Sequence, residues 1–370
     1  LGRAATGLAG CPGELMMLDL EVTPVPTAAA IINDLAVLDS GSHEQPRPHV
    51  PAPNDGDCWS VEDPLIAGAG GRDALGDAIA RAIRRSYDQV YDGQHTGRFH
   101  WAQLSKTEKT NAGSLVEIWL ARELDLHDGS DLDFQIAGHE VDCKFSQRVG
   151  GWMLPPEVID HIAMLVTADD YLGTWSLGLL RITTDRIHSA TNRDSKATLN
   201  APGRADIRWL FKDETLPGNA LLRMPTADTV AVMSSHRSGY ARSGQERLDE
   251  LFRRAQGMRI SRTVIATVAQ QDDPMKRVRS NGGSRSRLAA EGYLLLGHYR
   301  THRDVARALG VPVPNSGEIV SVRVHPARHA NRPGTATIGG TSWRLWRAGD
   351  DLVSAPALTH TARSANIANA

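Results

Sequence analysis

The chain has few cysteines and no long apolar run, and each absence excludes a class of protein. Cys11, Cys58 and Cys143 are the only three cysteines in 370 residues, too few for a disulfide framework, so a reducing compartment is expected. No apolar stretch reaches membrane-spanning length, and residues 1–20 lack the basic start and apolar core of a signal peptide. We therefore expect a cytoplasmic protein without a membrane partner.

Several catalytic and binding motifs are also missing. The sequence has no zinc-ligand spacing, no glycine-rich phosphate loop and no internal repeat. Val90-Tyr91-Asp92-Gly93-Gln94-His95 is similar to the K-x-D-G-x-R motif of DNA ligases, but valine stands where the ligase has its nucleophilic lysine. Valine forms no covalent intermediate, so ligase chemistry is excluded there and Asp92-Gly93 is interpreted as a turn.

Charge is unevenly distributed along the chain. The net charge of −2 hides an acidic start, because residues 1–60 hold eight acids, two arginines and seven prolines. Residues 236–310 hold fifteen Lys and Arg against seven acids. A basic region in a near-neutral protein indicates a local anionic partner.

This distribution suggests three regions. Residues 1–60 are predicted to be a mostly disordered extension with one helix near residues 28–38. The turn formers in Leu216-Pro217-Gly218-Asn219 mark a boundary between two folded domains, at residues 61–215 and 216–370. An apolar fraction of 41% is sufficient for two cores.

The first folded region centres on Glu117–Lys144. Ser114 opens a run with helical spacing, which places Glu117 in the first turn of a predicted helix. Ser114 and Glu117 also form S-x-x-E, so a capping box is an alternative role for this glutamate.

A predicted β-hairpin follows this helix. Leu132–Ile136 and Glu140–Phe145 alternate apolar and polar residues, with Gly138-His139 as a candidate two-residue turn. That turn pairs Ile136 with Val141, so one face of the hairpin is apolar.

The other face of the hairpin is charged. It carries Asp133 opposite Lys144 and Gln135 opposite Asp142. Together with Glu117, these acids repel one another unless a cation lies among them, and Mg²⁺ prefers such oxygens. The Cys143 carbonyl is a further candidate ligand, and Lys144 a candidate for stabilising charge on a reacting phosphate. The alternative is a solvated strand face with a cross-strand ion pair.

The pattern of two acids and a lysine is that of the PD-(D/E)xK nuclease superfamily. With it, a set of segments resembles the NaeI-type restriction endonucleases over roughly Ser60 to Pro356, namely Tyr91–Gln94, Lys106–Thr110, Val141–Ser146, Trp152–Glu157, Thr191–Asp194 and Val264–Asp273. The resemblance implies an α/β fold, a restriction-endonuclease-like mixed sheet flanked by helices, with a C-terminal winged helix-turn-helix-like α+β domain. It matches Glu117, Asp133, Asp142 and Lys144 to the catalytic positions, with Glu117, Asp133, Asp142 and the Cys143 carbonyl as Mg²⁺ ligands.

The resemblance also implies an activity and partners. It suggests a prokaryotic, homodimeric type II restriction endonuclease that cuts both strands of double-stranded DNA at a palindromic GC-rich site, GCCGGC. A second DNA copy, bound by the C-terminal domain, would act as activator. The rival hypothesis is a DNA-binding regulator whose nuclease fold is catalytically idle.

Two polar segments of the first domain are candidate DNA contacts. Lys106 and Lys109 are suited to backbone phosphates, with a solvated loop as the alternative. Asn192 and Arg193 carry donors suited to bases or phosphates, with a simple turn as the alternative.

The second domain has the element order of a winged helix-turn-helix. Residues 247–256 are predicted helical, and 261–271 form either a helix or a strand. Asp273 as N-cap and Pro274 at N1 start a short helix, a basic loop follows Asn281-Gly282-Gly283, and Tyr293–Leu296 is a strand. The candidate DNA-reading residues are Lys276, Arg277, Arg279, Arg285 and Arg287, with a solvated charged face as the alternative.

A second helix-turn-helix candidate lies downstream. Asp304–Val311 resembles its first half, but Pro312, Pro314 and Gly317 leave no recognition helix after it.

Overall fold

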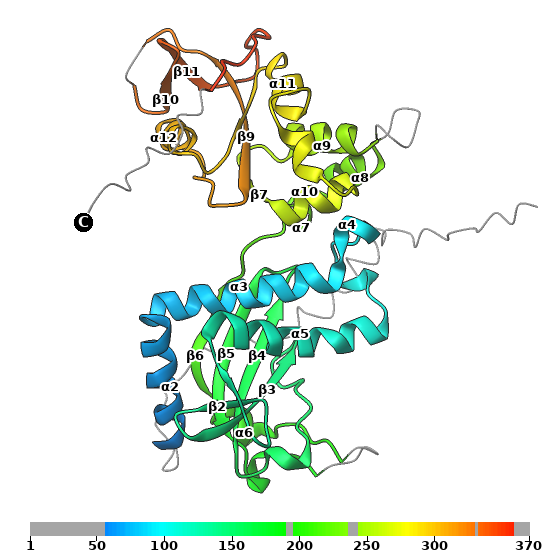
Figure 1. Ribbon diagram of the computed structural model, residues 1–370, viewed down its shortest axis with the longest axis vertical. Helices are drawn as coiled ribbons and strands as arrows, with labels where there is room; N and C mark the ends of the chain where they lie inside the picture. Colours follow the sequence, from blue (N-terminus) through cyan, green and yellow to red (C-terminus); the bar gives the residue numbers. More distant parts are fainter. Residues whose placement is uncertain (1–55, 190–194, 236–242, 330–331, 359–370) are drawn as a thin grey trace, which may run out of the picture. The chain divides into compact units, whose positions relative to one another are not determined.

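The structure is a computed structural model and describes residues 56–189, 195–235, 243–329 and 332–358 (Figure 1). Residues 1–55 of the predicted disordered extension, its predicted helix and the candidate contacts Asn192 and Arg193 lie outside these ranges. Residues 56–60, which were also predicted to be disordered, are helical. Within them, no helix combines the length and apolar character needed to cross a membrane.

A six-stranded mixed sheet forms the framework of the first folded region. Its strands are β1 (His127–Asp128), β2 (Phe134–Ile136), β3 (His139–Ser146), β4 (Ile162–Asp169), β5 (Thr174–Arg181) and β6 (Arg208–Thr215). They lie in chain order, with β3 and β4 parallel and the other neighbouring pairs antiparallel. The mixed sheet flanked by helices is confirmed.

Both faces of this sheet are covered. Helices α2 (Gly56–Ala69), α3 (Arg72–Tyr91) and α5 (Lys106–Leu124) share a core with one face, and α3 runs beside α5 in Figure 1. On β4, Met164 belongs to that core, whereas Leu165 packs with Trp152 on the opposite face. Burial on both faces explains why β4 is a continuous apolar run.

Short elements complete this region. They are α4 (Gly93–Thr96), η1 (Trp101–Gln103), η2 (Pro156–Val158), η3 (Thr184–Arg186) and α6 (Ala201–Ala205). Asp92 takes a left-handed conformation (φ 46°) between α3 and α4, which confirms the predicted turn at Asp92-Gly93.

The start of α5 corrects a prediction. The helix begins at Lys106, so Glu117 lies in its interior rather than in its first turn. The capping box is formed by Ser105 and Glu108, because the Ser105 side chain accepts from the Glu108 N–H and the Glu108 carboxylate from the Ser105 N–H. The capping alternative for Glu117 is therefore wrong. The polar first turns carry no apolar periodicity, which hid this part of the helix.

The hairpin turn lies one residue earlier than predicted. Ile136 pairs with His139 and Phe134 with Val141, so the two-residue turn is Ala137-Gly138. Both residues have positive φ, 52° and 84°, as a type I′ turn requires. Gln135 accordingly pairs with Glu140, not Asp142. The shift changes each partner by two positions, so the predicted apolar face with Phe134, Ile136, Val141 and Cys143 is retained and buried.

The C-terminal region is a mixture of helices and a second, antiparallel sheet. Its elements are α7 (Ala220–Arg223), α8 (Thr226–Ser234), α9 (Ser243–Arg254), β7 (Arg259–Ser261), α10 (Arg262–Ala269), η4 (Pro274–Val278), α11 (Ser284–Ala289), β8 (Tyr293–Leu296), α12 (Arg300–Leu309), β9 (Glu318–Pro326), β10 (Thr335–Ile338) and β11 (Thr341–Leu345). Strand β9 is central, because Val320 pairs with Arg259 of β7 and Leu296 of β8.

Most predicted elements of this region are confirmed, with two refinements. Residues 261–271, predicted as either a helix or a strand, contain the helix α10. Asp273 is the predicted N-cap, and the element that it caps, η4, is a 3₁₀ helix of five residues. The predicted basic loop is wrong, since Arg285 and Arg287 lie in the helix α11. After α12 the described chain proceeds directly to β9, so the downstream candidate has no recognition helix.

Candidate active site

Strand β3 brings an acid and a lysine to the centre of the first sheet. Asp142 and Lys144 alternate with the buried Val141 and Cys143, and β3 lies between β2 and β4. A strand with neighbours on both sides has a fixed backbone, so these side chains leave it from well-defined positions.

The loop before β2 supplies the second aspartate. Asp133 accepts a hydrogen bond from the Cys143 N–H to its Oδ2 at 2.7 Å, and the same oxygen lies 3.7 Å from Lys144 Nζ. Lys144 Nζ also donates to Asp142 Oδ1 at 2.6 Å and to the Cys143 carbonyl at 3.1 Å. The structure thus brings together three of the four predicted catalytic side chains around one ammonium group.

Glu117 lies on α5, the helix beside this cluster. The helix packs against β3, and partial burial raises the pKa of Glu117. The charge of Asp133 raises this pKa further, whereas Lys144 acts in the opposite direction. The Glu117 carboxylate thus shares the electrostatic environment of Asp133 and Lys144.

The Asp142 carboxylate is buried and only partly satisfied. Burial raises its pKa to about 6, although the hydrogen bond from Lys144 counteracts the shift, and the charges of Asp133 and Glu157 add to it. Its Oδ2 atom is buried and has no hydrogen-bond partner among the described residues. A buried carboxylate oxygen without a donor is costly unless something cationic reaches it.

The donor set fits a hard divalent cation. Glu117, Asp133 and Asp142 offer carboxylate oxygens and Cys143 a carbonyl, the ligand types that Mg²⁺ takes together with water and substrate phosphate. Among the described residues, no three His, Cys, Asp or Glu side chains are already gathered into a metal-binding group. The evidence for a cation site is therefore the Asp142 Oδ2 atom, which has no donor among the described residues, together with the negative charge of the neighbouring carboxylates.

Glu140 holds the loop that carries Asp133. Its carboxylate accepts from the backbone N–H groups of Ser130, Asp131 and Leu132 at 2.9, 3.2 and 3.0 Å. These bonds lower the pKa of Glu140. A Cβ at Gly129 would lie 2.4 Å from the Leu132 carbonyl oxygen, so only glycine fits this tight loop. Sequence reasoning missed this contact. The signal was present, since Glu140 shares the strand alternation of Asp142 and Lys144.

The predicted DNA contacts of the first region are only partly described. Lys106 is exposed and Lys109 half-buried in the first turn of α5, a helix rather than the loop of the alternative interpretation.

The five candidate DNA-reading residues of the C-terminal region differ in whether their side chains are bonded within the protein. Arg277 Nε donates to Gln271 Oε1 at 2.8 Å, and Arg287 Nε forms an ion pair with the buried Asp249 at 2.6 Å. Lys276 and Arg279 are exposed, and Arg285 is half-buried. The first two arginines are therefore tied into the fold, whereas the others remain open to a ligand.

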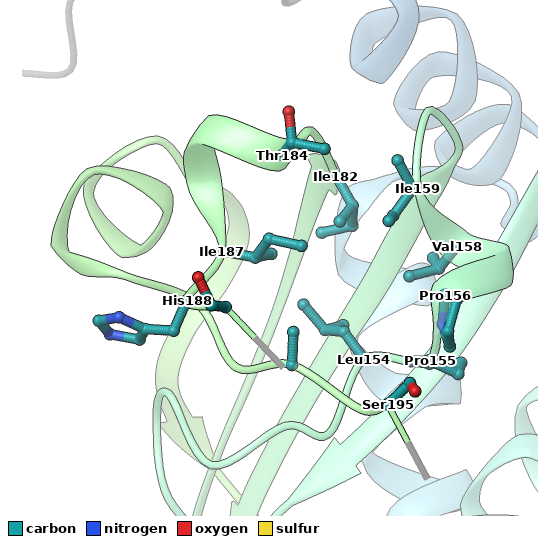
Figure 2. Close-up of a pocket in the computed structure, with 12 residues that line it drawn as sticks. Leu154, Pro155, Pro156, Val158, Ile159, Ile182, Thr184, Ile187, His188 and Ser195 are labelled. Atoms are coloured by element: carbon teal, nitrogen blue, oxygen red, sulfur yellow. The ribbon is translucent and has the colours of Figure 1, made fainter. Parts of the chain in front are cut away.

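An apolar pocket of the first region contains none of the four side chains of the site. It has a volume of about 380 Å³, and Leu154, Val158, Ile182 and Ile187 point into it in Figure 2. Among the described residues that line it, His188 carries the only titratable side chain. Such a lining provides packing surface rather than the acids and the amine of the β3 cluster.

Comparison with known proteins identifies the class of this chain. The sequence profile described as restriction endonuclease NaeI matches residues 68–354. The type II restriction enzyme NaeI of Lentzea aerocolonigenes is 47% identical over 285 residues, which cover 77% of this chain and 90% of that protein. The chain is thus a type II restriction enzyme, a site-specific deoxyribonuclease.

Within that class, the chain belongs to the restriction endonuclease NaeI family. The relationship supports a DNA-cleaving enzyme over the rival hypothesis of an idle nuclease fold.

Proposed function

We propose that the protein hydrolyses both strands of a palindromic GC-rich DNA site, GCCGGC, in a reaction that requires Mg²⁺. The observation that carries the chemistry is the ammonium of Lys144 between two carboxylates, one of which has a buried oxygen that finds no partner in the described part of the chain. The proposed site sequence rests on the similarity to the type II restriction enzyme NaeI.

In this proposal, each side chain of the cluster has a distinct task. Asp142, Asp133 and Glu117, with the Cys143 carbonyl, hold the Mg²⁺ ion. When bound, that ion lowers the pKa of a water and neutralises charge on the leaving oxygen. Lys144 remains protonated, because its pKa is raised by Asp142 and Asp133 against the effect of burial. It donates to the phosphate oxygens as negative charge develops in the transition state.

Residues 61–215 are proposed as the catalytic domain and 216–370 as a separate DNA-binding domain. The order α9, β7, α10, η4, α11, β8, β9, with β9 between β7 and β8, supports a winged helix-turn-helix. Helix α11 then takes the recognition position. We propose that this domain binds a second DNA copy that activates cleavage.

The test is a digest of DNA of known sequence with mapped product ends, with and without Mg²⁺. Cleavage within GCCGGC, dependent on Mg²⁺, is expected. Cutting at a different sequence would refute the proposed site, and undiminished cutting in a metal chelator would refute the metal requirement. Plasmids with one and two copies of the site test activation, since equal cutting rates would exclude the second DNA copy.

A further inference from the structure

A cavity in the C-terminal region is lined by three arginines. It has a volume of about 450 Å³ and is bounded by Arg262 at the start of α10, Arg279 after η4 and Arg285 on α11. We call it the arginine pocket. Residues from three separate elements converge there, so the positive charge is produced by the fold rather than by one basic run.

No carboxylate neutralises these arginines within the part of the chain that the structure describes. Neighbouring arginines are paired, for example Arg253 with Glu291 at 2.7 Å and Arg254 with Asp228 at 2.5 Å. The one acid that lines the pocket, Glu318, accepts from the Asn315 N–H at 2.8 Å and lies 3.8 Å from Arg259.

Arg285 is the most enclosed of the three cations. Arg285 is half-buried, and this burial lowers the pKa of its guanidinium. Separating a cation from water is unfavourable unless an anion compensates it.

An exposed aromatic side chain lines the pocket beside the arginines. Tyr299 is 44% exposed, and its ring stacks on His298 with centroids 4.9 Å apart and an angle of 20° between the planes. A Cβ at Gly297 would lie 3.9 Å from both Arg285 Nη2 and Tyr299 Cδ2, so the missing side chain leaves room between them. Cations beside an exposed aromatic ring suit a phosphate whose attached sugar lies against the ring.

We propose that the arginine pocket binds a phosphate group, supplied by the backbone of the DNA copy that the C-terminal domain takes up. This inference rests on the proposed function. It adds Arg262 and Tyr299 to the residues that contact DNA. It also assigns phosphate binding to Arg279 and Arg285 rather than to Arg277 and Arg287, whose side chains are bonded within the protein. Guanidinium groups suit this role because their planar donors match the oxygens of a phosphate.

The test measures binding, not cleavage, with the full chain and a duplex without Mg²⁺ at several salt concentrations. Arg279→Gln and Arg285→Gln should each weaken binding about tenfold, and each should reduce the slope of log affinity against log salt by about 0.9 for one lost phosphate contact. Arg303→Gln is the matched control, because Arg303 is an exposed arginine on α12 that does not line the pocket. Thermal unfolding of each variant establishes that it is folded, and Arg279→Gln, at an exposed residue, decides the result if Arg285→Gln unfolds.

A second arm uses inorganic phosphate alone. If phosphate raises the melting temperature of the wild type but not of the pocket variants, while the DNA salt slopes are unchanged, the pocket binds a free anion and the DNA source is overturned. Unchanged salt slopes together with no phosphate effect would overturn the pocket as a phosphate site. Cleavage by the wild type is measured separately, so an inactive enzyme would refute the proposed function without deciding the binding result.

Discussion

At the scale of single residues, the site depends on charges that the fold keeps close despite their repulsion. Asp142 is almost fully buried, and this burial disfavours its charged form and raises its pKa to about 6. Lys144 compensates one oxygen and leaves the other without a donor. A site that is left electrostatically incomplete in this way is expected of a catalytic centre, because its strongest interactions are reserved for the ligand and the transition state.

Lys144→Ala is expected to abolish cleavage while preserving DNA binding. Loss of one preorganised donor to developing charge lowers catalytic rates by about 10² to 10³-fold. Cleavage rates and equilibrium binding of the same duplex measure the two effects. Wild-type cleavage rates in the variant would exclude Lys144 from the chemistry, and a parallel loss of binding would assign it to affinity instead.

Glu140→Gln tests whether the loop before β2 positions Asp133. The Glu140 carboxylate accepts hydrogen bonds from three backbone N–H groups of the loop. The glutamine side chain has one oxygen and one NH₂ group, and the NH₂ group cannot accept from these donors, so the loop should shift. A displacement of about 1 Å costs up to roughly 10²-fold in rate, and we expect a fall in kcat, an unchanged KM and a higher Mg²⁺ requirement.

The matched control is Glu214→Gln, an exposed acid on β6. If the Glu140 and Glu214 variants have the same kcat and the same Mg²⁺ requirement, the positioning role is refuted.

At the scale of elements, turns and caps determine where the reactive side chains emerge. The hairpin between β2 and β3 sets the register that brings Asp133 to the Cys143 N–H. The capping box at Ser105 starts α5 early enough for Glu117 to lie in its interior. Both features are local, and each can be tested by a change far from the chemistry.

Ala137→Asn should stabilise the hairpin. Ala137 has φ 52°, a conformation that alanine adopts at a cost and that asparagine tolerates well in a type I′ turn. The free energy of unfolding, measured by urea denaturation, should rise by about 0.5 to 1 kcal/mol.

Gly138→Ala is the opposite test in the same turn. No atom lies within 4 Å of an added Cβ, so its only cost is the backbone at φ 84°. Loss of about 1 kcal/mol is expected. Stabilisation by this change would contradict the turn type.

The Glu108 carboxylate gives the α5 cap a defined pH dependence. Hydrogen bonds from Ser105 and an ion pair with Arg98 at 2.7 Å lower its pKa below the ordinary 4.5. The ionised form is therefore favoured in the folded state. Its stabilisation is complete above pH 4.5 and is lost as the pH falls through the lowered folded-state value.

Glu108→Ala should accordingly lower the melting temperature near pH 7 and have a smaller effect near pH 3. A capping residue contributes about 1 kcal/mol. A difference between wild type and variant that grows toward low pH would contradict the cap.

At the scale of the whole molecule, the proposed cleavage of both strands of a palindrome favours two symmetry-related active sites. Each chain contains one β3 cluster, and the strands of a palindrome are related by a two-fold axis. We therefore expect a homodimer with twice the chain mass of 40.1 kDa in sedimentation equilibrium. A species of single-chain mass, both free and on DNA, would contradict this expectation.

The sequence by itself predicted the family of this protein and most of its elements. The alternation in β3 and the order of acid, acid and lysine predicted which side chains share a face, because a strand of period two leaves few options. The sequence of α10 is compatible with both a helix and a strand, since a short apolar run fits both structures until its neighbours are known.

Only the tertiary structure decided the start of α5, the register of the hairpin and the convergence of Arg262, Arg279 and Arg285 on one pocket. A polar helical turn has no apolar period, a two-residue turn fits two positions, and a pocket joins residues distant in sequence. Such features depend on packing between elements, and local patterns do not contain that information.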